Sequence, residues 1–228
     1  MLEQLINIDT ALTLSINGSH SLWLDGFAMA VTSTMTWLPA ALVLVYVIIR
    51  HGEIPNIVVT VLAIGLCILL ADQIASGIFK PLAARPRPAG DPLLMLDIDV
   101  VNDYRGGRYG FFSSHAANTF AVATFVSLIV RYRLLTVTLC SWALLNCWSR
   151  IYLGVHYVGD VVCGIICGIL VGLFVYYIYT RLTRSRRFAA SSADIQTVTG
   201  FAIDDARLLV GTLLLLFSYC NFIALFFA

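Results

Sequence analysis

Charged residues are scarce in this sequence. Asp, Glu, Lys and Arg make up 12% of its 228 residues, and hydrophobic residues make up 60%. Soluble domains carry about 25% charged residues, so the composition excludes an ordinary soluble domain. Several apolar runs reach the roughly 20 residues that a helix needs to cross a bilayer. We therefore predict an integral membrane protein in which residues 1–228 form a single membrane domain.

Several familiar sequence signals are also missing. Residues 1–21 contain Glu3 and Asp9 but no basic start and no clean apolar core, so we do not expect a secretory signal there. None of the six cysteines forms a CxxC pair, and all lie in apolar segments, which is typical of small buried residues. The net charge of +1 gives no reason to expect a nucleic-acid partner, and no feature predicts the oligomeric state.

The pattern of apolar residues predicts helices. The short alternating strands of a membrane barrel are absent, and so are tandem repeats. Residues 1–20 mix polar and apolar side chains and predict a short helix in the membrane interface. The predicted fold class is all-α, a polytopic membrane helical bundle of about six spans, with an extra C-terminal span and a cytoplasmic linker over residues 188–206. The predicted spans are 25–49, 57–79, 113–130, 134–149, 157–180 and 207–227.

Basic residues divide the chain into two sides. Arginines flank the span ends on one side, which the positive-inside rule makes cytoplasmic: Arg50, Arg131, Arg133, Arg181, Arg184, Arg186 and Arg187. The other side then holds the N-terminus, residues 80–112, residues 149–156 and the C-terminus. That side carries basic residues against the rule: Lys80, Arg85, Arg87, Arg105, Arg108 and Arg150. A bound anion would explain why they are there.

Three polar clusters lie on this second side. They read KPLAARPRP at residues 80–88, FFSSHAANTF at 111–120 and SRIYLGVHYVGD at 149–160. Prolines between positions 81 and 92 predict an extended or turning loop directly after a span. Ser113 and Ser114 stand where the next helix begins, and a helix start favours an anion. Because arginine and lysine match phosphate oxygens, the clusters predict a phosphate site.

Two histidines and one aspartate fit catalysis at that phosphate. His156 and Asp160 are four residues apart and would share one face of a helix. The carboxylate would then fix the imidazole tautomer and leave the other ring nitrogen free to attack phosphorus. His115 would protonate the leaving group as a general acid. This division of work predicts phosphoryl transfer through a phosphohistidine.

Each feature also has a plainer explanation. The histidine–aspartate pair could be a structural hydrogen bond, and the basic side chains could snorkel to the interface. Arg85 could equally be a solvated loop charge, and this applies more strongly to Arg105 and Arg108. A zinc site of His115, His156 and Asp160 is a further alternative, which the surrounding cations disfavour. The glycines at 164, 168 and 172 predict close helix packing.

The three clusters together resemble the type 2 phosphatidic acid phosphatase (PAP2) superfamily of membrane lipid phosphatases, which is related to vanadium haloperoxidases. The first family motif, KxxxxxxRP, matches at Lys80, Arg87 and Pro88. The third, SRxxxxxHxxxD, matches in full from Ser149 to Asp160. The second, PSGH, reads FSSH at residues 112–115, so Phe112 and Ser114 replace the proline and glycine of the family.

The resemblance implies a fold core like that of the haloperoxidases and a role for each matching residue. His156 would be the nucleophile, Asp160 its partner, and His115 the acid that protonates the leaving alcohol. The residues that would hold the phosphate are Lys80, Arg87, Ser113, Ser114 and Arg150. The family uses no metal, so neither a metal nor another cofactor is expected.

The predicted function is hydrolysis of a phosphomonoester or diphosphate on a membrane lipid. Polyprenyl diphosphate, phosphatidylglycerol phosphate, phosphatidic acid and lipid A are the candidate substrates, and residues 89–112 with the first spans would discriminate among them. The site would face the extracytoplasmic side of the cytoplasmic (inner) membrane, which is the periplasm in a cell with two membranes. The alternative is a non-enzymatic transporter or flippase of an anionic lipid. Two absences disfavour it: the sequence shows no inverted repeat, and apart from Asp72 it places no ionisable side chain in the middle of the membrane.

Overall fold

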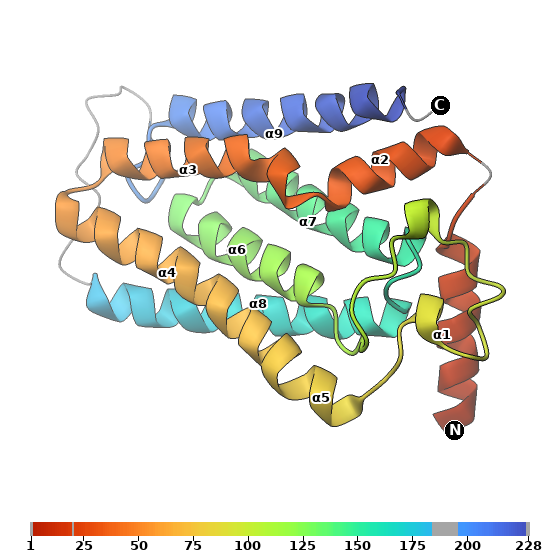
Figure 1. The fold of residues 1–228 in the computed structure, drawn as a ribbon. Coiled ribbons are helices and arrows are strands. Elements are labelled where there is room, and N and C mark those ends of the chain that lie inside the picture. The colour runs from red at the N-terminus through yellow and green to blue at the C-terminus, as the bar shows by residue number, and fades with distance from the viewer. Residues whose placement is uncertain (1, 20, 184–195, 227–228) are drawn as a thin grey trace.

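The computed structural model describes residues 2–19, 21–183 and 196–226, which fold as packed helices (Figure 1). Within these residues the only β pairing is two isolated bridges, so the all-α prediction is confirmed. The helices are α1 (Leu2–Ile16), α2 (Leu22–Thr32), α3 (Leu38–His51), α4 (Ile54–Asp72), α5 (Lys80–Ala83), α6 (Ser114–Val130), α7 (Arg133–Tyr152), α8 (Val158–Leu182) and α9 (Ile203–Ala224).

The helices make this a multi-pass membrane protein. Segments long and apolar enough to cross a membrane are Thr34–His51, Ile54–Ala83, Arg133–Tyr152, Val158–Leu182 and Ile203–Ala224. The apolar α6 has 17 residues and packs against α4, α7 and α8. Because α9 begins at Ile203, the end of the predicted 188–206 linker belongs to this helix, while residues 188–195 lie outside the described part.

The predicted first span over 25–49 is wrong as a single helix. The chain leaves the helical conformation at Ser33 and continues through a 3-10 turn, Thr34–Trp37, into α3. Side chains replace the backbone hydrogen bonds lost at this break. Thr36 Oγ1 donates to the Ala30 carbonyl at 2.7 Å, and Trp37 Nε1 donates to the Val31 carbonyl at 2.8 Å. These bonds allow a break inside an apolar stretch without unpaired carbonyls.

The predicted loop over residues 81–92 begins later than expected. A π-helix, Gln73–Phe79, follows α4 and leads directly into α5, so helical structure continues to Ala83. Pro81 follows directly on the π-helix, and such a local π adjustment lets helical structure continue past a residue that has no N–H to donate. Lys80 is therefore held on a helix at the membrane boundary and does not lie on a loop.

Glycines let α8 approach α6 closely, as the sequence predicted. A Cβ added at Gly164 would lie 2.5 Å from the carbonyl oxygen of Ser113, and one at Gly168 would lie 2.4 Å from that of Ala117. Atoms cannot approach this closely, so larger residues would push the two helices apart. This contact fixes the start of α6 beside the start of α8.

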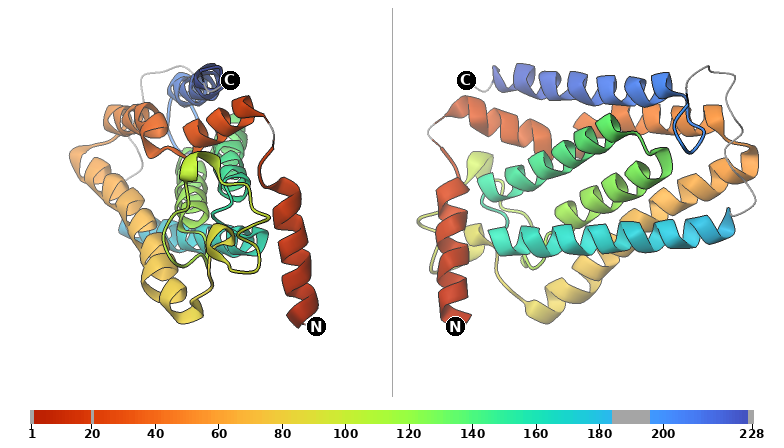
Figure 2. Two further views of the ribbon diagram at one scale, coloured as in Figure 1. Left: turned by 45° about the vertical axis from the view of Figure 1, so that its right-hand side comes forward. Right: turned by 180° about the vertical axis from the view of Figure 1, so that it is seen from behind.

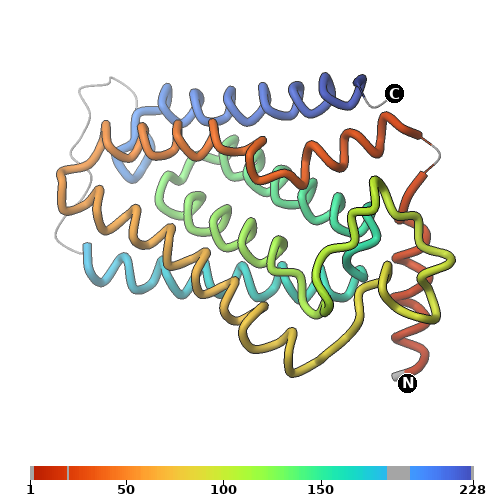
Figure 3. Tube along the Cα trace, viewed as in Figure 1, coloured from red at the N-terminus to blue at the C-terminus, as the bar shows by residue number. Residues whose placement is uncertain are grey.

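Helix α1 runs across one end of the bundle, roughly at right angles to the long helices (Figure 1). Seen from behind, it stands beside the end of α7 and the start of α8 (Figure 2). The chain between α5 and α6 folds over the same end (Figure 3). Asn17 ties these parts together, because its amide donates to the carbonyls of Asp99 at 3.0 Å and Tyr152 at 2.8 Å.

Candidate active site

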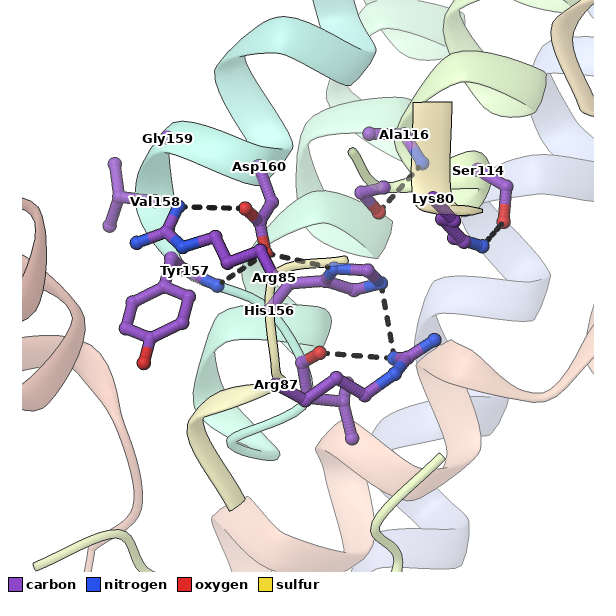
Figure 4. Close-up of polar contacts among 12 residues, drawn as sticks. Lys80, Arg85, Arg87, Ser114, Ala116, His156, Tyr157, Val158, Gly159 and Asp160 are labelled. Atoms are coloured by element: carbon purple, nitrogen blue, oxygen red, sulfur yellow. Dashed lines mark hydrogen bonds and ion pairs between the residues drawn. The ribbon is translucent and has the colours of Figure 1, made fainter. Parts of the chain in front are cut away.

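The three polar clusters of the sequence meet at this end of the bundle (Figure 4). The loop after α5 brings Arg87, the start of α6 brings His115, and the turn between α7 and α8 brings His156. His115 lies close enough to His156, and to the charged side chains of Arg87, Lys80 and Arg150, to interact electrostatically with them. The predicted basic and histidine side chains therefore surround one place.

His156 and Asp160 form a pair, but not on a shared helix face as predicted. The helix begins only at Val158, so His156 stands in the preceding turn. Its Nδ1 lies 3.4 Å from Asp160 Oδ2, and the same carboxylate oxygen accepts the Tyr157 N–H at 3.1 Å. An acidic residue in the first turn reaches back to the N–H before the helix, and this capping places the carboxylate beside the imidazole.

The contacts of the imidazole determine its tautomer. Arg87 NH1 lies 3.3 Å from His156 Nε2, and a guanidinium only donates, so Nε2 accepts and carries a lone pair. The ring proton is then on Nδ1 and points to Asp160. Burial, followed by the charges of Arg87, Arg150 and Lys80, lowers the pKa of His156 well below its usual value. The ring is therefore neutral, as a nucleophile must be.

The two buried arginines whose charges act on His156 each keep one nitrogen without a partner among the described residues. Arg87 NH1 also donates to the Val155 carbonyl at 3.0 Å, while its Nε has no partner within the described residues. Arg150 NH1 donates to Thr32 and to the Tyr104 hydroxyl, and its Nε likewise lacks a partner there. Burial and the charge of Arg150 lower the pKa of Arg87. An anion bound between Arg87 and Arg150 would accept hydrogen bonds from the free donors and would reduce the repulsion between the two charges.

Lys80 and the two serines complete the cationic side. Lys80 Nζ donates to Ser114 Oγ at 3.0 Å and to Ser76 Oγ at 3.0 Å. Ser113 caps α6, and its hydroxyl accepts the Ala116 N–H at 3.4 Å. The Ser113 N–H donates to the Asp160 carbonyl at 3.0 Å, whereas the Ser114 hydroxyl accepts from Lys80 and keeps its own O–H for a phosphate. The backbone N–H of Ser114, at the first position of α6, is a second donor for that phosphate. Ser114, which replaces a family glycine, holds the lysine in place.

The side chains of the site differ in their exposure. His156 and Arg150 are buried, whereas Lys80, Ser114 and His115 are partly exposed. An apolar cavity of about 570 Å³ adjoins the partly exposed residues, and it is lined by α4, the π-helix and α8 together with Phe79, Phe111 and Phe112. A phosphate carried on a hydrocarbon chain could therefore reach the cations while the chain stays in apolar surroundings.

Sequence reasoning left one member of the site open, Arg85, and missed another, Asp9. Arg85 is not a free loop charge, because it donates to Asp160 at 2.9 Å and to Asp9 of α1 at 2.7 Å. Nothing in the local sequence of α1 marks Asp9, and only the fold brings it there. Arg105 pairs with Asp103 and Arg108 stacks on Tyr109, so neither joins the phosphate cluster.

The alternative zinc site is not formed by the geometry. In the part of the chain that the structure describes, no three His, Cys, Asp or Glu side chains lie close enough together to share a metal ion. Asp160 instead directs its carboxylate to Arg85, Tyr157 and His156.

Comparison with known proteins agrees with the geometry. Residues 60–184 match the family model described as the PAP2 superfamily. The chain is 39% identical to a lipid A 4′-phosphatase of Bacteroides thetaiotaomicron, covering 80% of this chain and 82% of the relative. It is 34% identical to a lipid A 4′-phosphatase of Porphyromonas gingivalis, covering 83% of this chain and 80% of the relative.

The fold also resembles a solved structure. The crystal structure of a transmembrane PAP2 type phosphatidylglycerolphosphate phosphatase from Bacillus subtilis superposes with a TM-score of 0.61. That likeness covers 80% of this chain and 90% of the other at 21% sequence identity, so it concerns the fold alone.

Proposed function

The chain belongs to the PAP2 superfamily and is a membrane lipid phosphatase, and from this premise we propose that it removes a phosphate from lipid A. The observation that carries the proposed chemistry is the buried His156, whose Nε2 faces the Arg87 guanidinium while Nδ1 faces Asp160. The choice of lipid A among the four candidate lipids is supported by two relatives of that name, each aligned over most of its length.

In the first step His156 Nε2 attacks phosphorus, and the P–O bond to the lipid breaks. The electron pair leaves on the lipid oxygen, which takes a proton from His115. His115 holds this proton in the complex because the negative charge of the bound phosphate offsets the surrounding cations. Arg87, Arg150, Lys80 and the backbone N–H groups at the start of α6 hold the phosphate oxygens and stabilise their charge. Asp160 stabilises the positive charge that forms on the imidazole, since Nδ1 keeps its proton.

In the second step water attacks the phosphohistidine. His115 accepts a proton from this water, and the P–N bond breaks to return the neutral imidazole. One lipid phosphate and one water thus give one lipid alcohol and one inorganic phosphate. The arrangement of cations supports a substrate phosphate at the end of the bundle opposite Arg50, Arg131 and Arg133. By the positive-inside rule, this is the periplasmic side of the inner membrane.

Replacement of His156 by Ala tests the chemistry. We expect phosphate release from lipid A in detergent micelles to fall by more than about 10⁴-fold, since the covalent step is lost. Thermal unfolding should show that the variant is folded, and persistent turnover would contradict the assignment. Wild-type turnover in the presence of a chelator is expected to be unchanged, because no step uses a metal.

A panel of purified lipids tests the substrate. Lipid A, phosphatidylglycerol phosphate, phosphatidic acid and polyprenyl diphosphate should be compared by turnover, with lipid A expected to be the fastest. A protein that binds these lipids but releases no phosphate from any of them would be a transporter or flippase.

A further inference from the structure

We infer that Asp9 on α1 is a positioning residue, which acts through Arg85 to orient the Asp160 carboxylate behind the nucleophile. This inference rests on the proposed function, since it takes His156 as the attacking group. Helix α1, which crosses the end of the bundle (Figure 1), would then have a functional role, whereas the sequence predicted only a helix in the membrane interface.

Arg85 connects two carboxylates. Its NH2 donates to Asp9 Oδ2 at 2.7 Å, and its NH1 donates to Asp160 Oδ1 at 2.9 Å. The other carboxylate oxygen of Asp160 faces His156 Nδ1 at 3.4 Å. The side chains of Asp9, Arg85 and Asp160 are 16%, 26% and 0% exposed, so their mutual attraction is only partly screened by water.

Tyr157 fixes the plane of this connection. The Arg85 guanidinium lies over the Tyr157 ring, 3.7 Å from its centroid. The Tyr157 hydroxyl donates to Asp91 Oδ2 at 2.8 Å, which holds the ring in turn. Arg85 therefore cannot rotate freely about the carboxylate that it binds, and its orientation depends on Asp9 and Tyr157.

Asp9 also supports the first turn of α8 directly. Its Oδ1 accepts the Gly159 N–H at 2.7 Å, and the neighbouring Thr13 hydroxyl accepts the Val158 N–H at 3.1 Å. A helix start leaves such N–H groups without partners of its own. Helix α1 thus supplies the cap of the turn that carries Asp160. A Cβ added at Gly159 would lie 2.9 Å from Asp9 Oδ2, so a larger residue there would push the Asp9 carboxylate away.

The expected effect on catalysis follows from charge. Asp160 must keep its negative charge available to the imidazolium that forms when His156 attacks. The Arg85 guanidinium partly neutralises that charge. Asp9 limits this effect, because it attracts the same guanidinium away from Asp160. Without Asp9, Arg85 is free to swing fully onto Asp160 and to pull it from Nδ1. The basic side chains that bind the phosphate lie on the other side of the imidazole, so the affinity for the substrate should not change.

The test is a double-mutant cycle of Asp9→Asn and Arg85→Gln. Steady-state phosphate release from lipid A in mixed micelles gives kcat and KM separately. We expect Asp9→Asn to lower kcat by about 10- to 100-fold, as small misplacements of catalytic groups do, with little change in KM. In the Arg85→Gln background, Asp9→Asn should cause almost no further loss. Glu3→Gln is the matched control, since it removes an exposed carboxylate from the same helix.

Several outcomes would overturn the inference. Wild-type kcat in Asp9→Asn would do so, as would losses from the two substitutions that simply multiply, or a rise in KM with kcat unchanged. If Asp9→Asn does not fold, Arg85→Lys replaces it, because lysine keeps the charge but lacks the fork that reaches both carboxylates. Wild-type kcat in Arg85→Lys would equally contradict it. Activity in His156→Ala would instead refute the proposed function, so the two failures are distinguishable.

Discussion

At the scale of single residues, the neutral imidazole of His156 should make stability depend on pH. An unfolded histidine has a pKa of about 6.5, whereas the folded environment lowers the pKa of His156 well below this value, chiefly through burial. Below about pH 6.5 the unfolded chain therefore binds a proton that the folded chain does not. The stability that comes from keeping His156 neutral is therefore fully present above about pH 6.5. Below that pH, the free energy of unfolding falls by up to about 1.4 kcal/mol per pH unit.

Thermal unfolding in detergent at about pH 7.5 and about pH 5.5 measures this effect. The wild type should lose more stability on acidification than His156→Gln, which has no group to titrate at this position. Equal losses in the two proteins would contradict the interpretation of the site as a neutral histidine among cations.

The residues at fixed motif spacings could be predicted from sequence, whereas their supports could not. Lys80, His115 and His156 are recognisable because their side chains suit phosphate chemistry and stand at the spacings of the family motifs. Arg85 stands two positions from Arg87 in the same loop, and no local pattern distinguishes a phosphate ligand from a bridge between carboxylates. Asp9 is 151 positions from Asp160, so only the packing of α1 on α8 brings them together.

At the scale of elements, the contact of α6 with α8 should be sensitive to a single methyl group. Gly168→Ala would place a Cβ 2.4 Å from the Ala117 carbonyl oxygen, and backbone cannot yield as a side chain can. We expect a loss of about 1–3 kcal/mol in the free energy of unfolding, as overpacking causes. Gly211→Ala on α9 is the matched control, because nothing lies within 4 Å of its added Cβ. A similar melting temperature for both variants would contradict this packing account.

The helices themselves could be predicted from apolar length, but their interruptions could not. The break at Ser33 lies within a hydrophobic stretch and depends on Thr36 and Trp37 finding carbonyls that a continuous helix would have used. Arg150 then donates to Thr32 at the end of α2, so the break also supports a side chain of the site. A hydropathy profile cannot predict such hydrogen bonds, because they depend on the direction of side chains and not on composition.

At the scale of the whole molecule, the charges separate the two ends of the bundle. Arg50 and Arg131 lie at one end, and the phosphate cluster with α1 lies at the other (Figure 1). The side of the membrane remains a prediction from sequence, whereas only the fold shows that α1 and residues 84–113 lie at the end that carries the site. A substrate held in the outer leaflet would meet the cations at the depth of its own phosphate.

Labelling of introduced cysteines would establish the orientation. Asp97 is exposed at the end that carries the site, and Glu53 is exposed between α3 and α4 at the opposite end. A membrane-impermeant maleimide added to spheroplasts should label Asp97→Cys before lysis and Glu53→Cys only afterwards, because the arginine-rich end stays in the cytoplasm. The wild type, with its six native cysteines, gives the background. The reverse pattern would place the phosphate site in the cytoplasm and would require a substrate whose phosphate faces that side.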